Sequence, residues 1–138
     1  MRAFSLKIVT PDGLCFDGNV QEVIVRTTTG DLGLLAGHQD LVAPLGMGRA
    51  TIVVDGEKRY GACIGGMISM MNGCANLVAT TFEWADQIDV DRAAASEKRG
   101  KAVLADKTST DTDIRLAEAR IKRALVRQSA AASIDKNR

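Results

Sequence analysis

The sequence has few aromatic residues, and this shortage limits the partners it can bind. Phenylalanine, tryptophan and tyrosine make up only 4% of its 138 residues. Proteins that bind single-stranded nucleic acid stack bases on such side chains, and this chain offers little surface for that contact. The net charge of +1 also provides no overall attraction to nucleic acid or to an anionic membrane. We therefore expect no nucleic-acid partner.

Cysteine and histidine are scarce as well, which argues against a metal centre. Cys15, Cys63 and Cys74 are odd in number and widely spaced, and His38 is the only histidine. A zinc site needs four ligands at short paired spacings. We expect no metal and read the cysteines as buried, reduced thiols, so a metal enzyme built on them is the weakest hypothesis. We assign no catalytic residue, because the sequence offers no carboxylate pair, Ser/His/Asp set or activated cysteine.

The N-terminus lacks a targeting signal. The segment MRAFSLKIVTPDG has neither the apolar core of a secretory signal nor the Arg-rich amphipathic run of a transit peptide. We therefore expect the chain to remain in the compartment where it is made.

One uncharged stretch, Tyr60 to Phe82, is long enough to cross a bilayer. Asn72-Gly73 lies in its middle, and this dipeptide favours a two-residue hairpin turn because both positions adopt positive φ. Gly65-Gly66 is followed by neither the lysine nor the helix that a phosphate-binding loop requires. We therefore predict a β-hairpin here. Its cross-strand pairs would be Met70 with Ala75, Ile68 with Leu77, and Ser69 with Asn76.

The chain divides into two parts with different periodicity. Residues 1–86 contain short β-branched runs separated by glycine turns such as Asp55-Gly56, which is typical of an antiparallel sandwich or barrel. Residues 87–138 are rich in alanine and charged residues and predict helices over about 89–105 and 113–132, with Thr110 and Asp113 as a capping box. The predicted fold is an N-terminal antiparallel β-sandwich followed by a C-terminal two-helix antiparallel hairpin.

The predicted helical hairpin has few large apolar side chains. Burying each one contributes about 1.5–3 kcal/mol, whereas ordering each residue costs roughly 1–2 kcal/mol of backbone entropy. Gly100 should lower the stability of the first helix by up to about 1 kcal/mol relative to alanine. The apolar stripe expected on the second helix is Ile114, Ala117, Ile121 and Leu125. The hairpin is therefore either an arm that docks and detaches or a permanently docked cap, and both remain open.

Four motifs follow one another along the chain. Thr10-Pro11-Asp12-Gly13 forms a first turn, and residues 29–38 read TGDLGLLAGH. Gly65-Gly66 follows, and residues 88–93 read IDVDRA. In their order and spacing these motifs resemble those of the ε subunit of F-type ATP synthase, the equivalent of the mitochondrial δ subunit. The corresponding family motifs are the first hairpin, the acid-x-G-h-h-P-x-H loop, the Gly-Gly hairpin and the I/L-D-x-x-R-A helix start. Ala36 stands where that family usually has proline.

The resemblance implies a ten-stranded sandwich on the rotating central stalk, where it binds the γ subunit and rests on the c-ring. It implies a non-catalytic subunit that couples proton translocation to ATP synthesis, does not form a homo-oligomer and leaves catalysis to the α and β subunits. The residues expected at the γ and c-ring contact are Asp31, Gly33 and His38, with a solvated loop position as the alternative for His38. The implied location is the cytoplasmic face of a bacterial inner membrane.

The second predicted helix is strongly basic. The resemblance implies that it extends towards an acidic segment of the catalytic β subunits and inhibits ATP hydrolysis. A merely solvated basic face is the alternative. The residues concerned are Arg115, Arg120, Lys122, Arg123 and Arg127.

The start of the first predicted helix is a candidate site for regulatory ATP. The resemblance implies that Ile88, Asp89, Arg92 and Ala93 would bind it, with Arg92 contacting phosphate. The alternative is an ordinary helix start in which Asp89 caps the first turn. No cofactor is required in either case. The rival to the whole interpretation is a free-standing nucleotide-sensing module.

Overall fold

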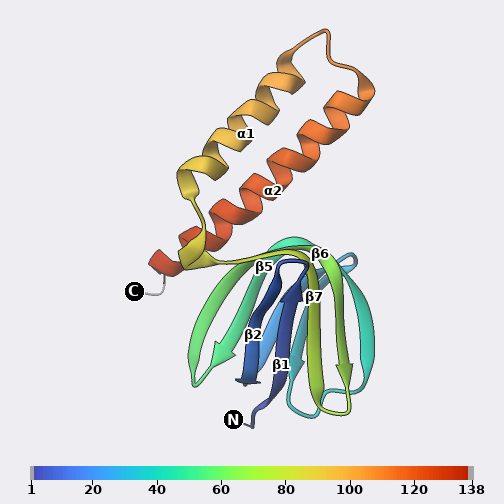
Figure 1. Cartoon of the computed structure of the whole chain (residues 1–138), viewed down its shortest axis with the longest axis vertical. Coiled ribbons are helices and arrows are strands. Elements are labelled where there is room, and N and C mark those ends of the chain that lie inside the picture. The colour runs from blue at the N-terminus through green and yellow to red at the C-terminus, as the bar shows by residue number, and fades with distance from the viewer. Residues whose placement is uncertain (1, 137–138) are drawn as a thin grey trace.

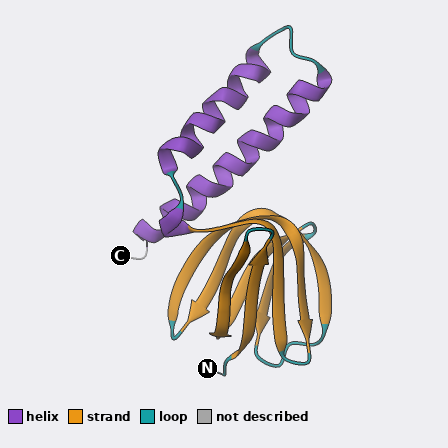
Figure 2. Cartoon of the chain, in the orientation of Figure 1, coloured by secondary structure: helices purple, strands orange, loops and turns teal. Residues whose placement is uncertain are grey.

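The computed structural model describes residues 2–136, and its two parts are seen in Figures 1 and 2. The strands are β1 (Phe4–Thr10), β2 (Gly13–Val20), β3 (Glu22–Thr27), β4 (Gly30–Leu35), β5 (Leu41–Val54), β6 (Glu57–Met71) and β7 (Cys74–Trp84). The short 3-10 helix η1 (Ala85–Gln87) leads to α1 (Val90–Ala105) and α2 (Asp111–Lys136). The predicted fold class, a sandwich followed by a helical hairpin, is confirmed. The division expected between residues 86 and 87 falls within η1 and stays a prediction.

The strands form one sheet in the order β2-β1-β7-β6-β5-β3-β4, which folds back on itself around the core (Figure 2). All neighbouring pairs are antiparallel except β1 and β7, which run parallel. The ten strands implied by the resemblance appear here as seven, because β5 and β6 are 14 and 15 residues long and curve without a break. The core includes Leu6, Ile8 and Ile52, all fully buried.

Two adjacent positions in β6 require glycine. Gly65 and Gly66 have φ of 71° and 117°, values that side-chain-bearing residues rarely adopt. A Cβ atom at Gly66 would also overlap the carbonyl oxygen of Val78 on β7. This Gly-Gly pair therefore serves the folding of the sheet.

The hairpin predicted at Asn72-Gly73 is confirmed. Asn72 and Gly73 have φ of 51° and 77°, and Asp55 and Gly56 form the second such turn with φ of 53° and 81°. The predicted cross-strand register is also present. Its pairs are Met70 with Ala75, Ile68 with Leu77, and Ser69 with Asn76.

The two helices form the predicted hairpin, and its capping box is confirmed. The backbone N of Asp113 donates to Oγ1 of Thr110 at 3.1 Å, while the backbone N of Thr110 donates to Oδ2 of Asp113 at 3.0 Å. These bonds begin α2 at Asp111, earlier than predicted, and α2 continues to Lys136. No helix within the described range is long and apolar enough to span a membrane.

Two expectations about the arm are wrong. Gly100 is buried, and a Cβ atom there would lie 2.7 Å from Cγ1 of Ile121, so glycine allows α1 and α2 to approach closely. It therefore stabilises the hairpin in a way that helix propensity alone does not reveal. The second expectation placed Leu125 on the apolar stripe of α2. Leu125 is 48% exposed, and Ala124 is buried instead, because the stripe that faces inward rotates around the helix.

Candidate functional site

The helical arm packs on the sandwich through the C-terminal part of α2, while α1 stands away from the sheet (Figure 1). Ala130 of α2 is fully buried against Ala62 of β6 and Ile88, which follows η1. Nε of Arg127 donates to Oε1 of Glu83 at 2.6 Å, and Nη1 of Arg49 donates to Oγ of Ser133 at 2.8 Å. The arm and the sandwich thus meet where the C-terminal part of α2 lies on β5, β6 and η1.

A pocket of about 440 Å³ lies beside this junction, between α1, α2 and the end of β7. Its chemistry is dominated by guanidinium groups. Both helices contribute them, and the arginines are Arg92, Arg99, Arg120, Arg123 and Arg127. Two carboxylates, those of Glu83 and Asp89, also line the pocket, which leaves a net positive charge. Such a site suits a ligand with several negative charges.

The four residues expected at a nucleotide site are only partly brought together. Asp89, Arg92 and Ala93 line the pocket, whereas Ile88 is buried in the junction with Ala62. Oδ1 of Asp89 accepts a hydrogen bond from the backbone N of Arg92 at 3.0 Å, so the helix cap considered as the alternative is present. The cap leaves the Arg92 side chain available to a ligand.

Sequence reasoning missed two charged residues of this pocket, Glu83 and Arg99. Arg99 lies seven residues after Arg92, two helical turns further along the same face, and this spacing was the available signal. Glu83 comes from β7 and enters the site only through the tertiary fold.

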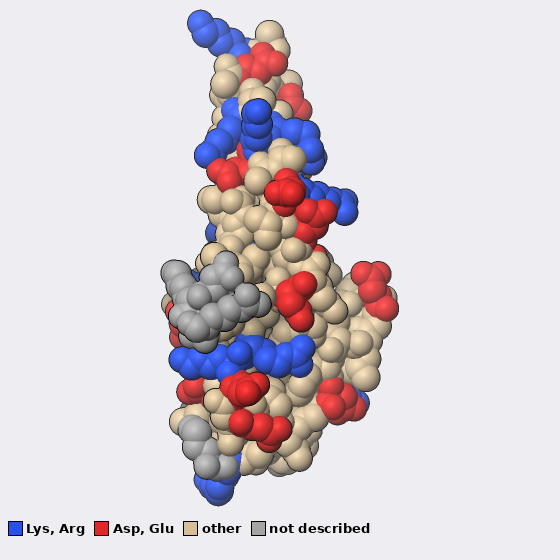
Figure 3. Space-filling model, turned by 90° about the vertical axis from the view of Figure 1, so that its left-hand side faces the viewer, with Lys and Arg blue, Asp and Glu red and all other residues tan. Residues whose placement is uncertain are grey.

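The five basic residues expected to inhibit hydrolysis face different directions. Arg120, Arg123 and Arg127 line the arginine-rich pocket. Lys122 lies on the other side of α2, in a cleft shared with β3 and β5, and Arg115 is exposed. Figure 3 shows that lysine and arginine side chains gather half-way along the arm. In the docked arm these residues therefore do not form one continuous basic face.

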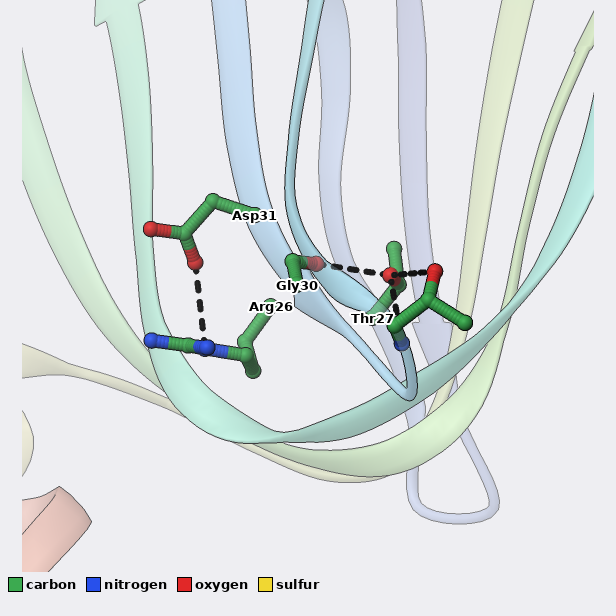
Figure 4. Close-up of polar contacts among 5 residues, drawn as sticks. Arg26, Thr27, Gly30 and Asp31 are labelled. Carbon is green, nitrogen blue, oxygen red and sulfur yellow. Dashed lines mark hydrogen bonds and ion pairs between the residues drawn. The ribbon is translucent and has the colours of Figure 1, made fainter.

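The residues expected at the γ and c-ring contact lie along β4 and beyond it. Asp31 is at the tip of the β3–β4 hairpin, where its Oδ1 lies 3.1 Å from Nε of Arg26 (Figure 4). Gly33 is in the middle of the strand, and His38 follows its opposite end, with Nδ1 2.8 Å from the carbonyl oxygen of Gln39. Because a strand rises about 3.3 Å per residue, Asp31 and His38 belong to opposite ends of β4 and cannot form one cluster.

Hydrogen bonds within the β3–β4 tip hold Asp31 in place. Oγ1 of Thr27 donates to the carbonyl oxygen of Gly30 at 2.6 Å and accepts from the backbone N of Thr29 at 3.2 Å (Figure 4). The tip is therefore ordered and charged, and its Arg26 and Asp31 line the same cleft as Lys122 of α2.

An apolar row crosses the outer face of five strands. Its members are cross-strand neighbours, and sequence reasoning did not identify it. The row runs Pro44, Met67, Val78, Val9 and Leu14. Met67, Val78 and Leu14 are 44%, 53% and 61% exposed. Apolar side chains that follow one another in this way are characteristic of an interaction surface.

The surroundings of Glu97 and Cys63, both outside the arginine-rich pocket, shift their pKa values. Hydrogen bonds from Lys101 and Gln128 lower the pKa of Glu97, and the bond from Gln128 joins α2 to α1. Burial raises the pKa of Cys63 to about 12, so its thiol is unreactive at neutral pH. Among residues 2–136 no three potential metal-ligating side chains come together.

Comparison with known proteins identifies the family. The model of the ATP synthase delta/epsilon chain β-sandwich domain matches residues 3–85. The ATP synthase epsilon chain of Bacillus velezensis is 40% identical over 127 residues, which cover 92% of this chain and 96% of the relative. The epsilon chain of Bacillus subtilis is 39% identical over 115 residues, covering 83% of this chain and 86% of the relative.

Solved structures share the fold at low sequence identity. A chain in the Euglena gracilis mitochondrial ATP synthase complex of OSCP, F1 and c-ring superposes with a TM-score of 0.82 at 19% identity, covering 93% of this chain and 81% of that one. A chain in the central stalk and c-ring of the Tetrahymena thermophila mitochondrial enzyme gives a TM-score of 0.60 at 13% identity, covering 92% and 95%. The chain therefore belongs to the ATP synthase delta/epsilon family and is a non-catalytic subunit of that enzyme.

Proposed function

We propose that this subunit couples rotation of the c-ring to ATP synthesis through its sandwich and restrains ATP hydrolysis through its helical arm. The observation that carries the proposal is the independence of the two parts. The main core cluster draws all its buried residues from positions 4–84, whereas the arm is attached over a small junction. A sandwich with its own core can remain fixed to the rotor while the arm changes position.

The apolar row is the surface we assign to the γ subunit. Met67 and Val78 are adjacent across β6 and β7, and both expose apolar area that a partner would bury. Replacing Val78 with lysine would place a charge in the middle of that contact. Val78→Lys should therefore abolish co-purification with γ, whereas Leu125→Lys, at an exposed position on the arm, should leave it intact. Binding of γ by Val78→Lys at the unaltered level would overturn this assignment.

The two ends of β4 are suited to separate polar contacts on the rotor. Asp31 lies near the β3–β4 tip, paired with Arg26, and His38 lies beyond the other end of the strand. We assign Asp31 and Gly33 to the c-ring side and His38 to the edge of the γ contact. Cysteines placed at 31 and 38 should then cross-link to different partners in the assembled enzyme, and cross-linking of both to the same partner would contradict the division.

The basic residues of α2 are the part we assign to inhibition of hydrolysis. Arg115, Arg120 and Lys122 are exposed in the docked arm, while Arg123 and Arg127 are half-buried beside the pocket. Release of the arm would therefore present the full set of charges to an acidic segment of the catalytic subunits. Because this attraction is electrostatic, inhibition should weaken as salt concentration rises.

Regulatory ATP is the ligand we assign to the arginine-rich pocket. Arg92 and Arg99 of α1 face Arg120 and Arg123 of α2, and a polyphosphate between them would offset their repulsion. Bound ATP would favour the closed hairpin and withhold the same arginines from inhibition. Calorimetric titration of the full chain should detect binding, Arg123→Gln should weaken it about tenfold, and Arg115→Gln, outside the pocket, should not change it.

The subunit would work as a peripheral component at the cytoplasmic face of a bacterial inner membrane, held there by the rotor. Failure of the full chain to bind γ or the catalytic complex, together with ATP binding by the isolated chain, would favour the free-standing nucleotide sensor instead. Fractionation of a cell that produces the assembled enzyme tests the placement, since the chain should leave the membrane together with γ.

A further inference from the structure

The junction between arm and sandwich contains two matched sets of residues. On the sandwich, Arg49, Ala62 and Glu83 are direct cross-strand neighbours on β5, β6 and β7. On α2, three residues spaced three apart contact them one by one. Arg127 pairs with Glu83, Ala130 packs with Ala62, and Ser133 pairs with Arg49.

The spacing of the two sets explains why each residue finds one partner. Neighbouring strands lie about 4.8 Å apart, and residues three apart on an α-helix advance about 4.5 Å. A helix that crosses the strands with one face down therefore passes one such residue over each strand. Sliding α2 by one residue would turn the stripe away from the sheet and break all three contacts together.

The three contacts differ in chemistry, which gives the match a single direction. Arg127 and Glu83 form an ion pair at 2.6 Å, and their side chains are only 28% and 35% exposed. At the other end, Arg49 donates to Ser133, whose hydroxyl donates in turn to the carbonyl oxygen of Ser129 at 2.9 Å. Reversing α2 would place a guanidinium opposite a guanidinium.

The central contact allows no enlargement. Ala62 and Ala130 are both fully buried, and Ser133 is 3% exposed. Arg49 also lies with Cζ 5.0 Å from the centre of the Tyr60 ring, a cation–π contact beside its bond to Ser133. A larger side chain at position 130 would have to push the helix off the sheet.

We propose that these six residues form a latch that holds the arm in its docked position, and that its release is the step that frees the arm. The latch is defined as Arg49, Ala62 and Glu83 on the sandwich with Arg127, Ala130 and Ser133 on α2. Its regulatory consequence rests on the proposed function of the arm, while the latch itself is a property of the isolated chain.

Trp84 provides a natural reporter of the latch. It is the only tryptophan in the sequence and follows Glu83 directly. It is 6% exposed, and it lines a pocket shared with Ile134 at the end of α2. Undocking would uncover this pocket, so the emission of Trp84 should move to longer wavelength and become more accessible to a soluble quencher.

The test compares two identical substitutions on α2 of the full chain. Ala130→Leu should lower the docked population roughly tenfold, because the fully buried contact has no room for the added side-chain atoms. Ala132→Leu, at an exposed position, should leave Trp84 emission and quenching unchanged. Ser133→Ala should produce a smaller change in the same direction, and circular dichroism should confirm that all three variants retain their helices.

The outcomes separate the latch from the function assigned to the arm. Unchanged emission and quenching of Trp84 in both Ala130→Leu and Ser133→Ala would overturn the latch. Increased quenching in Ala130→Leu but not in Ala132→Leu supports it. The same variant, added to catalytic complex lacking this subunit, should inhibit hydrolysis more strongly than the native chain. If it undocks without changing hydrolysis, the latch stands and the inhibitory role of the arm fails.

Discussion

Arg127 donates through Nε to Oε1 of Glu83 across 2.6 Å, and this ion pair joins the helical arm to the last strand of the sandwich. Both side chains are partly shielded from solvent, so breaking the pair by charge reversal should cost on the order of 1 kcal/mol or more. Glu83→Arg and Arg127→Glu should each increase quenching of Trp84. In the double variant, Trp84 quenching should return most of the way to the native value. Quenching in the double variant as strong as in the single variants would contradict the pairing.

Gly100 is expected to be essential for close packing of the arm. A methyl group there would meet Cγ1 of Ile121 at 2.7 Å and the carbonyl oxygen of Ala117 at 3.1 Å. Gly100→Ala should therefore destabilise the hairpin by about 1–3 kcal/mol, although alanine is the better helix former. Hydrogen exchange of amides in α1 and α2 measures this. The control is Ala94→Gly, at an exposed position, which measures the cost of helix propensity alone. Faster amide exchange in Ala94→Gly than in Gly100→Ala would contradict the packing argument.

Gly66 should tolerate no side chain. Its φ of 117° and the overlap of any Cβ atom with the carbonyl oxygen of Val78 combine backbone strain with a steric clash. Gly66→Ala should lower the free energy of unfolding by on the order of 3 kcal/mol. Gly33→Ala is the control, because no atom lies within 4 Å of its added methyl group. Urea denaturation compares the two variants, and equal midpoints would contradict the strain and the clash assigned to Gly66.

The cysteines should differ sharply in reactivity. Burial raises the pKa of Cys63 to about 12, while Cys74 is exposed at the start of β7. Since the thiolate is the reactive form, iodoacetamide at pH 8 should modify Cys74 within minutes and leave Cys63 intact until the chain unfolds. Above about pH 9 the unfolded chain ionises Cys63 and the folded chain does not, so stability should fall. Mass spectrometry locates the modification, and early labelling of Cys63 would contradict its burial.

Local chemistry made the sandwich hairpins predictable. Asn72-Gly73 and Asp55-Gly56 both adopt positive φ because their small or polar side chains tolerate it, and the register of β6 and β7 follows from the turn. The role of Gly100 could not be predicted in this way, because it depends on how closely Ile121 approaches from another helix.

The candidate site was predictable only where its residues lie close together in sequence. Asp89 and Arg92 were found through one motif, whereas Glu83 joins the pocket from β7. The separation of Asp31 from His38 required the length and direction of β4. Matches between distant elements, including Arg49 with Ser133, depend on the register of the whole sheet and leave no signal in a single segment.

The central claim is that the sandwich anchors the subunit and the arm restrains hydrolysis. The most direct measurement is ATP hydrolysis by catalytic complex stripped of this subunit and refilled with the full chain or with a chain ending at Gln87, whose core lies within residues 4–84. The account predicts that both bind and that only the full chain slows hydrolysis. Equal rates with both chains bound would contradict it.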